Sequence, residues 1–254
     1  MDALDEDVPP GGEKEFVIDM DEIADRGSDQ PKPEFYYTSR TQQTQYKCDH
    51  CGEFNDIRGR FGYCASCGWR NNAQSLKVSF NALRERLNNG LATPAETVNS
   101  TVSEFDACCR NMVGEITKRV PMKPNRKADF ERSLFHDIDS AAVRSMKSMF
   151  DIDLLRGVGA EITFAQMMIH RRHVYTHNGG VADKKYVQES GDPDAREGVL
   201  IRETQINAHR LIGVLSRIIE NVDCDFHEIF QPTEWPVRHF DEWQARLAKR
   251  QNPR

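Results

Sequence analysis

Four of the seven cysteines form two Cys-x2-Cys pairs separated by twelve residues: Cys48, Cys51, Cys64 and Cys67. Cysteines spaced in this way can place four thiolates around one tetrahedral metal ion, and Zn²⁺ is the usual structural metal at such a site. Glycine follows the second cysteine of each pair, at Gly52 and Gly68, where a tight turn favours a residue without a side chain. The spacing therefore predicts a small module that folds around a structural Zn²⁺.

The module covers about residues 44–70 and resembles a zinc ribbon. A closed site of four sulfurs has no coordination position for water, so we expect the zinc to contribute folding energy and the chemistry to lie elsewhere. Cations alternate with aromatic residues in the second half of the module: Arg58, Arg60, Phe61, Tyr63, Trp69 and Arg70. This pattern suits contact with the phosphates and bases of nucleic acid. The alternative is that Tyr63 and Trp69 simply cover the metal site.

The remaining sequence points to a cytoplasmic protein with no membrane segment. It contains no run of 18 or more apolar residues, and its first seven residues are acidic where a signal peptide would be basic and then apolar. Cys108, Cys109 and Cys224 lie in apolar helical contexts, so we interpret them as reduced packing residues.

Residues 1–33 are predicted to be a disordered acidic tail. Residues 2–22 hold nine Asp or Glu and one Lys, with few large apolar side chains to offset the entropy lost on ordering. The tail either mimics nucleic acid over a basic site or only improves solubility. The net charge of −6 argues against indiscriminate nucleic-acid binding, but the basic residues of 47–77 allow a local basic surface.

After Arg70 the apolar residues follow helical spacing, which predicts a mainly α fold. A first helix should end near Asn88-Asn89-Gly90, and a long one should run from Pro94 until Pro121 stops it. A seam with alternating spacings of four and three marks the long helix: Val98, Val102, Phe105, Cys109, Met112 and Ile116. Further helices are expected at 127–136, from the cap Ser140 to Phe150, at 160–178 and at 203–221. We expect a bundle of five or six helices over residues 74–225.

Residues 226–254 are interpreted as a C-terminal tail. Trp235, Phe240 and Trp243 are apolar residues that favour a short helix folded back onto the bundle.

The functional prediction depends on the segment Arg171 to Gly180, Arg-Arg-His-Val-Tyr-Thr-His-Asn-Gly-Gly, at the end of a predicted helix. Arg172 stands five residues before His177. A guanidinium can neutralise a phosphate and an imidazole can transfer a proton near neutral pH. These two groups suffice for RNA cleavage without a metal, because the ribose 2′-hydroxyl supplies the nucleophile.

A regular helix separates positions 172 and 177 by about 140° around its axis, at about 100° per residue. Both side chains can reach one phosphate only if the last turn unwinds at 176–180, or if a second copy of the helix supplies the missing partner. A symmetric homodimer would bring two arginines and two histidines into one cleft.

At these residues the chain resembles the HEPN superfamily, all-α domains that carry an arginine, a polar residue, three further residues and a histidine. Asn178-Gly179-Gly180 and the following residues up to Tyr186 look like a subgroup of bacterial HEPN proteins. The resemblance implies a helical bundle that dimerises through the motif helix. It also implies a metal-independent endoribonuclease that leaves 2′,3′-cyclic phosphate ends, as in toxins and antiviral effectors, with RNA as substrate and an antitoxin or another protein as a further partner.

Carried over by position, the resemblance gives each motif residue a role. Arg172 would hold the scissile phosphate, His177 would act as general acid or base, and His173 would orient His177 or the substrate. Asn178 and Tyr175 are candidates for hydrogen bonds to substrate. Arg171 precedes Arg172, so which arginine contacts the phosphate stays open.

Three other interpretations remain at this point. His170, His173 and His177 recur at helical spacing and, with Asp183, form a candidate metal site. The same residues could merely cap and solvate a helix end. Finally, the protein could be a non-catalytic nucleic-acid-binding or adaptor protein in which the bundle dimerises and the ribbon makes the contact.

Overall fold

The computed structural model describes residues 43–132, 135, 137, 138 and 140–230, together with 242 and 245. The chain divides into two units, Met1–Gln43 and Thr44–Arg254, and the elements below belong almost entirely to the second. The predicted tails at 1–33 and beyond Phe230 lie outside the described residues, apart from 242 and 245. The strands are β1 (Gln43–Lys47) and β2 (Phe54–Arg58), and the helices are α2 (Asn72–Asn88), α3 (Pro94–Arg119), α4 (Pro124–Glu131), α5 (Ala141–Phe150), α6 (Glu161–His177), α7 (Lys184–Glu189) and α8 (Gln205–Ile229).

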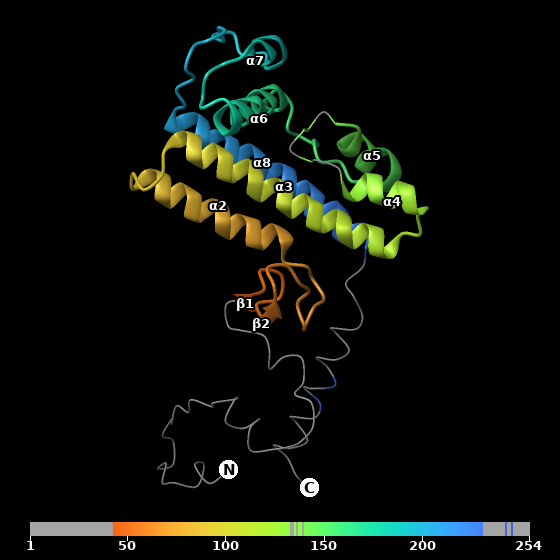
Figure 1. The fold of residues 1–254 in the computed structure, drawn as a ribbon. Helices are drawn as coiled ribbons and strands as arrows, with labels where there is room; N and C mark the ends of the chain where they lie inside the picture. The colour runs from red at the N-terminus through yellow and green to blue at the C-terminus, as the bar shows by residue number, and fades with distance from the viewer. Residues whose placement is uncertain are drawn as a thin grey trace, which may run out of the picture. The chain divides into compact units, whose positions relative to one another are not determined.

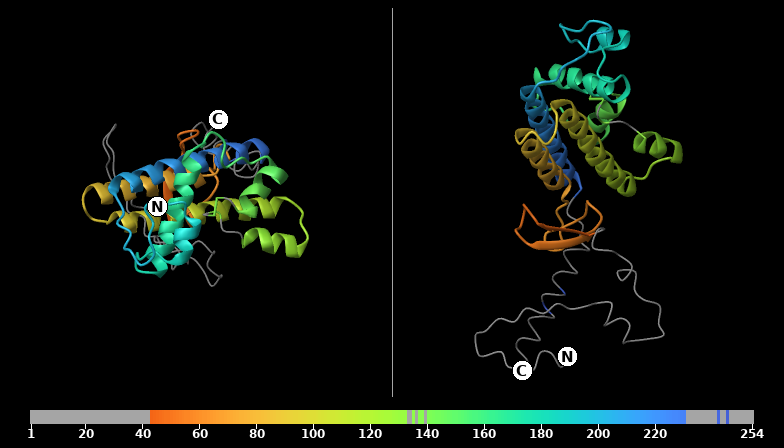
Figure 2. Two further views of the ribbon diagram at one scale, coloured as in Figure 1. Left: turned by 90° about the horizontal axis from the view of Figure 1, so that it is seen from above. Right: turned by 60° about the vertical axis from the view of Figure 1, so that its left-hand side comes forward.

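The described part of the chain is mainly helical, as predicted, with seven helices and one two-stranded sheet formed by β1 and β2. α2, α3 and α8 run alongside one another, and α6 crosses α3 and α8 near one end (Figures 1 and 2). α4 and α5 lie at the other end of α3. The four-cysteine module (residues 44–70), called the metal module below, lies at the start of α2.

Local signals determine where the first two long helices begin and end. Gly90 adopts a positive φ of 68° directly after α2, as its position after Asn88-Asn89 predicted. α3 opens with a capping box in which the Thr93 hydroxyl accepts from the Glu96 backbone N–H, and the Glu96 carboxylate accepts from that of Thr93. It ends at Arg119, two residues before Pro121. The predicted bounds of these two helices are therefore confirmed.

α3 is the central helix of the core. It packs against α2, α4, α6 and α8, and all six residues of its predicted seam are buried. The facing side chains come from α2 and α8: Leu76, Phe80, Leu87, Leu211, Leu215, Ile218 and Val222. Burying one such side chain contributes on the order of 1.5–3 kcal/mol. The core fixes the position of α6, which carries the Arg/His motif.

The helix predicted at 127–136 is shifted. α4 begins at Pro124, which occupies the first helical position, and ends at Glu131. The next prediction is confirmed: the Ser140 hydroxyl accepts from the Val143 backbone N–H and α5 runs to Phe150. α7 was not expected, because six residues are too few to show a period.

α8 continues to Ile229, so the bundle extends beyond residue 225 and the predicted end of its last helix at 221 is wrong. The extra turns carry polar residues that are buried because tertiary partners satisfy them. The Asp225 carboxylate accepts from the Asp153 backbone N–H and pairs with Arg156 at 2.8 Å. His227 contacts the metal module.

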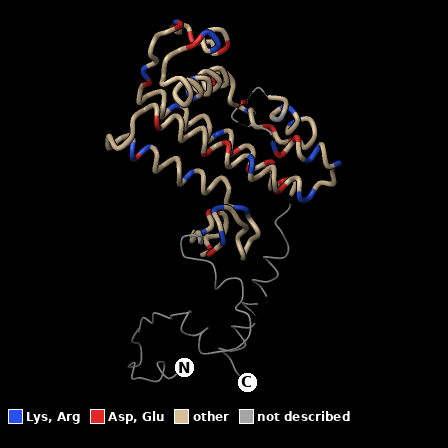
Figure 3. Tube along the Cα trace, in the orientation of Figure 1, with Lys and Arg blue, Asp and Glu red and all other residues tan. Residues whose placement is uncertain are grey.

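Charges of both signs are interspersed along the helices (Figure 3). Cys108 and Cys109 are buried packing residues, as expected, but Cys224 is exposed, which corrects its interpretation as a core residue. None of the described helices combines the length and the apolar composition needed to cross a membrane.

Candidate functional site

The four cysteines of the two Cys-x2-Cys pairs lie close together in the structure. Their Sγ atoms all lie within 4.8 Å of one another, with 3.8 Å between Cys48 and Cys67 and 3.5 Å between Cys51 and Cys64. Gly52 and Gly68 have φ values of 80° and 70°, so the predicted left-handed turns after each pair are present. The cluster can hold one metal ion.

Neighbouring N–H groups favour the thiolate form of Cys64. The buried Asn55 side chain donates to Cys64 Sγ at 3.3 Å and accepts from the Ala65 backbone N–H. Burial opposes ionisation, but hydrogen bonds from the Cys67 backbone and from Asn55 lower the pKa of Cys64 to about 7. A metal ligand must be deprotonated, so these bonds favour the ionised form at one of the four cysteines.

An aromatic stack joins this module to the bundle. The ring of Trp69 lies between His50, at 4.2 Å between centroids, and His227 of α8, at 3.7 Å. The His227 Nε2 accepts from the Arg70 backbone N–H at 3.0 Å and its Nδ1 donates to the Asp223 carbonyl at 2.8 Å. Both ring nitrogens are thus used, and the metal module is fixed directly on the end of α8.

Most cations and aromatics predicted to contact nucleic acid instead make contacts within the chain. Arg60 donates to Ser75, Ser79 and Glu104. The buried Arg70 donates to Asn111 at 2.7 Å and lies 4.6 Å above the Tyr63 ring. The Tyr63 hydroxyl in turn bonds to Glu115 and Arg119. Trp69 belongs to the aromatic stack, so its role exceeds covering the metal site. Arg58 is exposed on β2, and Phe61 is partly buried against the core.

α6 remains a regular helix through His177. The Asn178 backbone N–H donates to the Val174 carbonyl, and Gly179 and Gly180 then take φ values of 61° and 84°. The predicted glycine stop is confirmed. The last turn does not unwind within this structure, so one helix does not direct positions 172 and 177 to the same point.

Arg171 lies in a buried ionic network. Its guanidinium pairs with Asp192 at 2.7 Å and with Glu203 at 3.2 Å, and both carboxylates are almost fully buried. The hydroxyl of Tyr186 donates to Asp192, and that of Tyr175 donates to Glu203. The network ties α6 to α7 and to the segment before α8.

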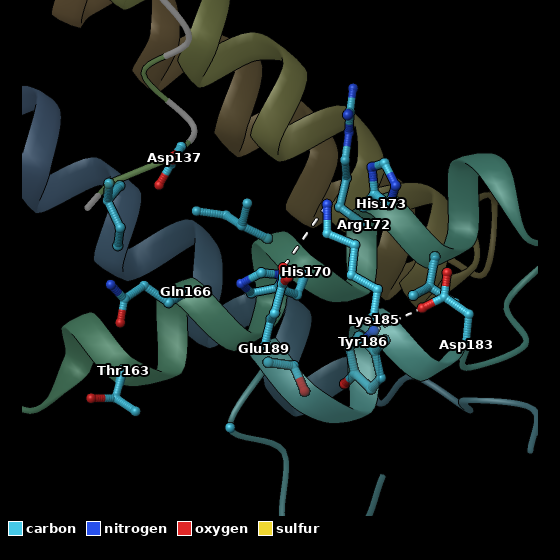
Figure 4. Close-up of a pocket in the computed structure, with 15 residues that line it drawn as sticks. Asp137, Thr163, Gln166, His170, Arg172, His173, Asp183, Lys185, Tyr186 and Glu189 are labelled. Carbon is cyan, nitrogen blue, oxygen red and sulfur yellow. Dashed lines mark hydrogen bonds and ion pairs between the residues drawn. The ribbon is translucent and has the colours of Figure 1, made fainter. Parts of the chain in front are cut away.

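Arg172 instead contributes to the wall of a pocket between α6 and α7 with a volume of about 610 Å³, and its side chain extends out of this pocket towards a neighbouring helix. We call this the motif pocket. Its polar and titratable lining residues are Asp137, Thr163, Gln166, His170, Arg172, His173, Asp183, Lys185, Tyr186, Glu189 and Ser190. Figure 4 shows Arg172 beside His173, with Lys185 and Glu189 reaching in from α7. The Arg172 Nε is buried without a hydrogen-bond partner, and no acid in the described part of the chain pairs with this guanidinium.

His173 and His177 form a pair on the exposed face of α6. Their ring centroids are 4.6 Å apart. Partial burial, with His177 and Lys185 nearby, lowers the pKa of His173 below its ordinary 6.5. The neutral form of His173, which can accept a proton or a hydrogen bond, is therefore favoured. His177 is exposed and does not line the motif pocket.

Asn178, another predicted substrate contact, donates to Asp183 at 2.7 Å. Asp183 also caps α7 by accepting from the Tyr186 backbone N–H. In the described part of the chain the cysteine cluster is the only assembled group of three or more metal ligands. The alternative metal site at His170, His173, His177 and Asp183 is therefore not formed.

The sequence prediction missed the partners of Arg171 and the contribution of Lys185. Asp192 and Glu203 lie in the loop after α7, where no period marks them as buried. A weak signal was the clustering of Asp192 with Gly191 and Pro193, which favours a fixed turn.

Comparisons of the chain with models of protein families, with curated proteins and with solved structures gave no match.

Proposed function

We propose that the protein is a metal-independent endoribonuclease in which Arg172 of one copy and His177 of a second copy act on one phosphodiester. The observation that carries this proposal is the Arg172 guanidinium. It lines a pocket beside His173, its Nε is buried without a partner, and no described acid neutralises it. A buried donor without a partner is costly, and a phosphate oxygen would satisfy it.

The reaction needs no group beyond these side chains. The ribose 2′-oxygen attacks the adjacent phosphorus, the bond from phosphorus to the 5′-oxygen breaks, and a 2′,3′-cyclic phosphate and a 5′-hydroxyl result. His177 accepts the 2′-hydroxyl proton and, once protonated, supplies a proton to the leaving 5′-oxygen. Arg172 neutralises the charge that grows on the phosphate, an effect typically worth 10²- to 10³-fold in rate.

The two arginines differ in a way that favours Arg172 as the phosphate ligand. Arg171 is already neutralised by Asp192 and Glu203, so bringing a phosphate to it would place three anions around one cation. The Arg171 network instead holds α6 and α7 in the arrangement that forms the motif pocket. We assign Arg171 and Tyr175 to positioning, and His173 to orienting His177 or the substrate.

The regular end of α6 supports the two-copy arrangement. Positions 172 and 177 could meet at one phosphate if the last turn of α6 unwound or if a second copy supplied the missing partner. The last turn is intact, which favours the second copy. An isologous contact between two α6 helices would bring His177 of each copy to the motif pocket of the other.

We also propose that the cysteine cluster holds Zn²⁺. A tetrahedron with metal–sulfur bonds of about 2.3 Å has edges of about 3.8 Å, close to the Sγ distances observed. The donor set of four thiolates is the usual one for structural zinc. Four ligands fill the coordination sphere, so the ion would stabilise the fold and would not take part in cleavage.

A non-catalytic RNA-binding or adaptor protein is the second candidate. The exposed position of His177, outside the motif pocket of its own copy, favours it. A role in stress or phage defence and an antitoxin partner rest on the HEPN resemblance alone, whereas the proposed cytoplasmic location rests on the composition of the sequence.

The test is cleavage of RNA during brief exposure to EDTA, which leaves slowly exchanging zinc in place. We expect cleavage by the wild-type protein, with 2′,3′-cyclic phosphate ends, and a loss of at least about 100-fold in Arg172→Ala and His177→Ala. His209→Ala, which removes a histidine of α8 outside the motif pocket, is the matched control. Binding of RNA without cleavage would contradict the nuclease and support the adaptor.

Mixing the two inactive variants tests the shared site. Half of the randomly formed dimers would carry one intact site of two, so about one quarter of the wild-type activity should return. No recovery in mixed dimers, together with activity of a monomeric form, would contradict the two-copy arrangement.

A further inference from the structure

A second pocket adjoins the motif pocket and shares one residue with it. This ribbon pocket has a volume of about 570 Å³ and lies between the metal module, α3 and α6. Its lining residues are Phe61, Val102, Ser103, Asp106, Ala107, Arg110, Asn111 and Arg172. Arg172 therefore stands between two hollows (Figure 4 shows its side chain leaving the motif pocket in the direction of a neighbouring helix).

We propose that the ribbon pocket binds the base of a nucleotide adjacent to the phosphate held by Arg172, with the ring of Phe61 as the stacking surface. This inference rests on the proposed ribonuclease function and adds to it a subsite and a role for the metal module. The module contacts RNA through one aromatic ring at the edge of the site, since most of its other cations and aromatics make contacts within the chain.

Phe61 is suited to this role because a fixed cation and the core hold its ring in place. The Arg60 guanidinium lies 4.9 Å from the ring centroid, and it is itself fixed by Ser75 at 3.1 Å and Ser79 at 2.9 Å. Phe61 is only partly buried, and it lines the pocket. A preorganised, partly exposed ring can serve as a platform for an unpaired base.

The α3 side of the pocket offers donors to the edge of a base. Both hydrogen bonds that Asn111 makes with described side chains use its oxygen, which accepts from Arg70 and Asn72. Its amide nitrogen thus remains to donate. The Arg110 side chain is half exposed and is held by Asp106. Base carbonyl oxygens and ring nitrogens are the matching acceptors.

The position of Arg172 connects the two pockets to one ligand. In single-stranded RNA one phosphate links each nucleotide to the next. A phosphate bound to Arg172, which lines both pockets, therefore places an adjacent base at the entrance of the ribbon pocket. Double-stranded RNA would keep its bases stacked and would not fill the ribbon pocket. We therefore infer that the substrate is single-stranded at the cleavage position.

The test compares the wild-type protein and three variants of the metal module on RNAs with and without one base. The variants are Phe61→Leu, which keeps apolar volume and loses the ring, Phe61→Tyr, which keeps the ring, and Phe54→Leu, which removes an exposed aromatic of the same module outside the pocket. The substrates are short single-stranded RNAs with one cleavable linkage, intact or lacking the base on one side of that linkage.

We expect Phe61→Leu to lower kcat/KM about tenfold on the intact RNA, as loss of one stacked base does. The same variant should have no effect on the RNA that lacks the recognised base, and the wild-type protein should lose about tenfold on that RNA. Phe61→Tyr and Phe54→Leu should behave as wild type. Equal metal content and melting temperature of the two leucine variants exclude loss of fold.

Equal rates for wild type and Phe61→Leu on all RNAs would overturn the inference, and so would an equal loss on RNAs with and without the base. Affinity for an RNA with a 2′-deoxy residue at the cleavage position separates the two proposals. If no RNA is cleaved, the nuclease proposal fails. The ribbon pocket is then supported only if Phe61→Leu weakens the affinity for RNA that has the base and leaves the affinity for RNA without it unchanged.

Discussion

The junction between the metal module and the bundle differs from the motif pocket in how it uses the same kinds of side chain. At the junction His227 uses both ring nitrogens and stacks on Trp69, and Arg70 donates to Asn111 beside Glu115. Arg70 and Arg172 both have a buried Nε without a partner, but Arg70 lies 3.5 Å from Glu115, whereas no described acid pairs with Arg172 of the motif pocket, and the neighbouring histidine pair is exposed. Cations and imidazoles at the first place hold the fold together, and those at the second are available to a ligand. Availability, more than residue type, marks the candidate site.

The largest effect is expected from a variant that disrupts the junction between the metal module and the bundle. In Cys64→Ser the module should lose its metal and its fold, because the remaining three thiolates no longer close the site. The bundle should then melt about 10 °C lower, since α8 loses the Trp69 stack and a few kcal/mol of contacts. Metal analysis and thermal melts check this. Cys224→Ser, at an exposed cysteine of α8, is the control and should match the wild type. An unchanged melting temperature in metal-free Cys64→Ser would show that the junction does not stabilise the bundle.

The next effect separates two adjacent arginines of the motif. Arg171→Ala leaves the buried carboxylates of Asp192 and Glu203 without their cation, which typically costs about 3–5 kcal/mol. Arg172→Ala leaves no described acid unpaired. We expect the first variant to melt about 10 °C lower and the second to melt nearly as wild type. Cleavage should show the reverse order.

Arg196→Ala, at an exposed position of the same loop as Asp192, is the matched control for charge and should change neither property. If Arg172→Ala proved the less stable of the two motif variants, the division between a positioning and a substrate-binding arginine would be wrong.

The smallest effect concerns pH at the junction. Burial lowers the pKa of His227 to about 4, so between pH 6.5 and 4 the unfolded state binds one more proton there and acid favours unfolding. Burial raises the pKa of Asp223 to about 7, so in the same range the folded state binds one more proton and acid favours folding. The two contributions nearly cancel.

Asp223→Asn removes the second contribution. The free energy of unfolding of this variant should fall, relative to wild type, by up to about 3 kcal/mol between pH 6.5 and 4. Denaturant titrations at a series of pH values measure it, and Glu220→Gln, at an exposed acid of the same helix, should follow the wild type. A constant difference across this range would mean that the pKa of Asp223 is not raised in the folded protein.

The sequence predicted the parts of the fold that short segments encode on their own. Glycine at 90 and 179, proline at 94 and 121 and the cap at Ser140 act within one turn, so the bounds of α2, α3, α5 and α6 were close. The cysteine spacing likewise defines its site, because a short module must bring the two pairs together.

What the sequence could not supply depends on contacts between distant residues. The last turns of α8 look too polar for a core helix, yet His227 and Asp225 are buried because Arg70 and Asp153 satisfy them. The cations of the metal module looked available for nucleic acid, and only the structure shows that Glu104 and Glu115 engage them. Likewise, only the tertiary arrangement distinguishes Arg171 from Arg172.

The close spacing of the second cysteine pair and α2 makes the chain sensitive to length here. Cys67 is followed after four residues by the first residue of α2, with the buried Arg70 and Asn71 between them. Inserting a single residue would turn the whole of α2 by about 100° and direct Leu76 and Phe80 away from α3. The number of residues between the metal site and α2 thus determines which face of α2 packs against the core. Insertions between 68 and 72 should therefore be far less tolerated than insertions in the loop at 191–198.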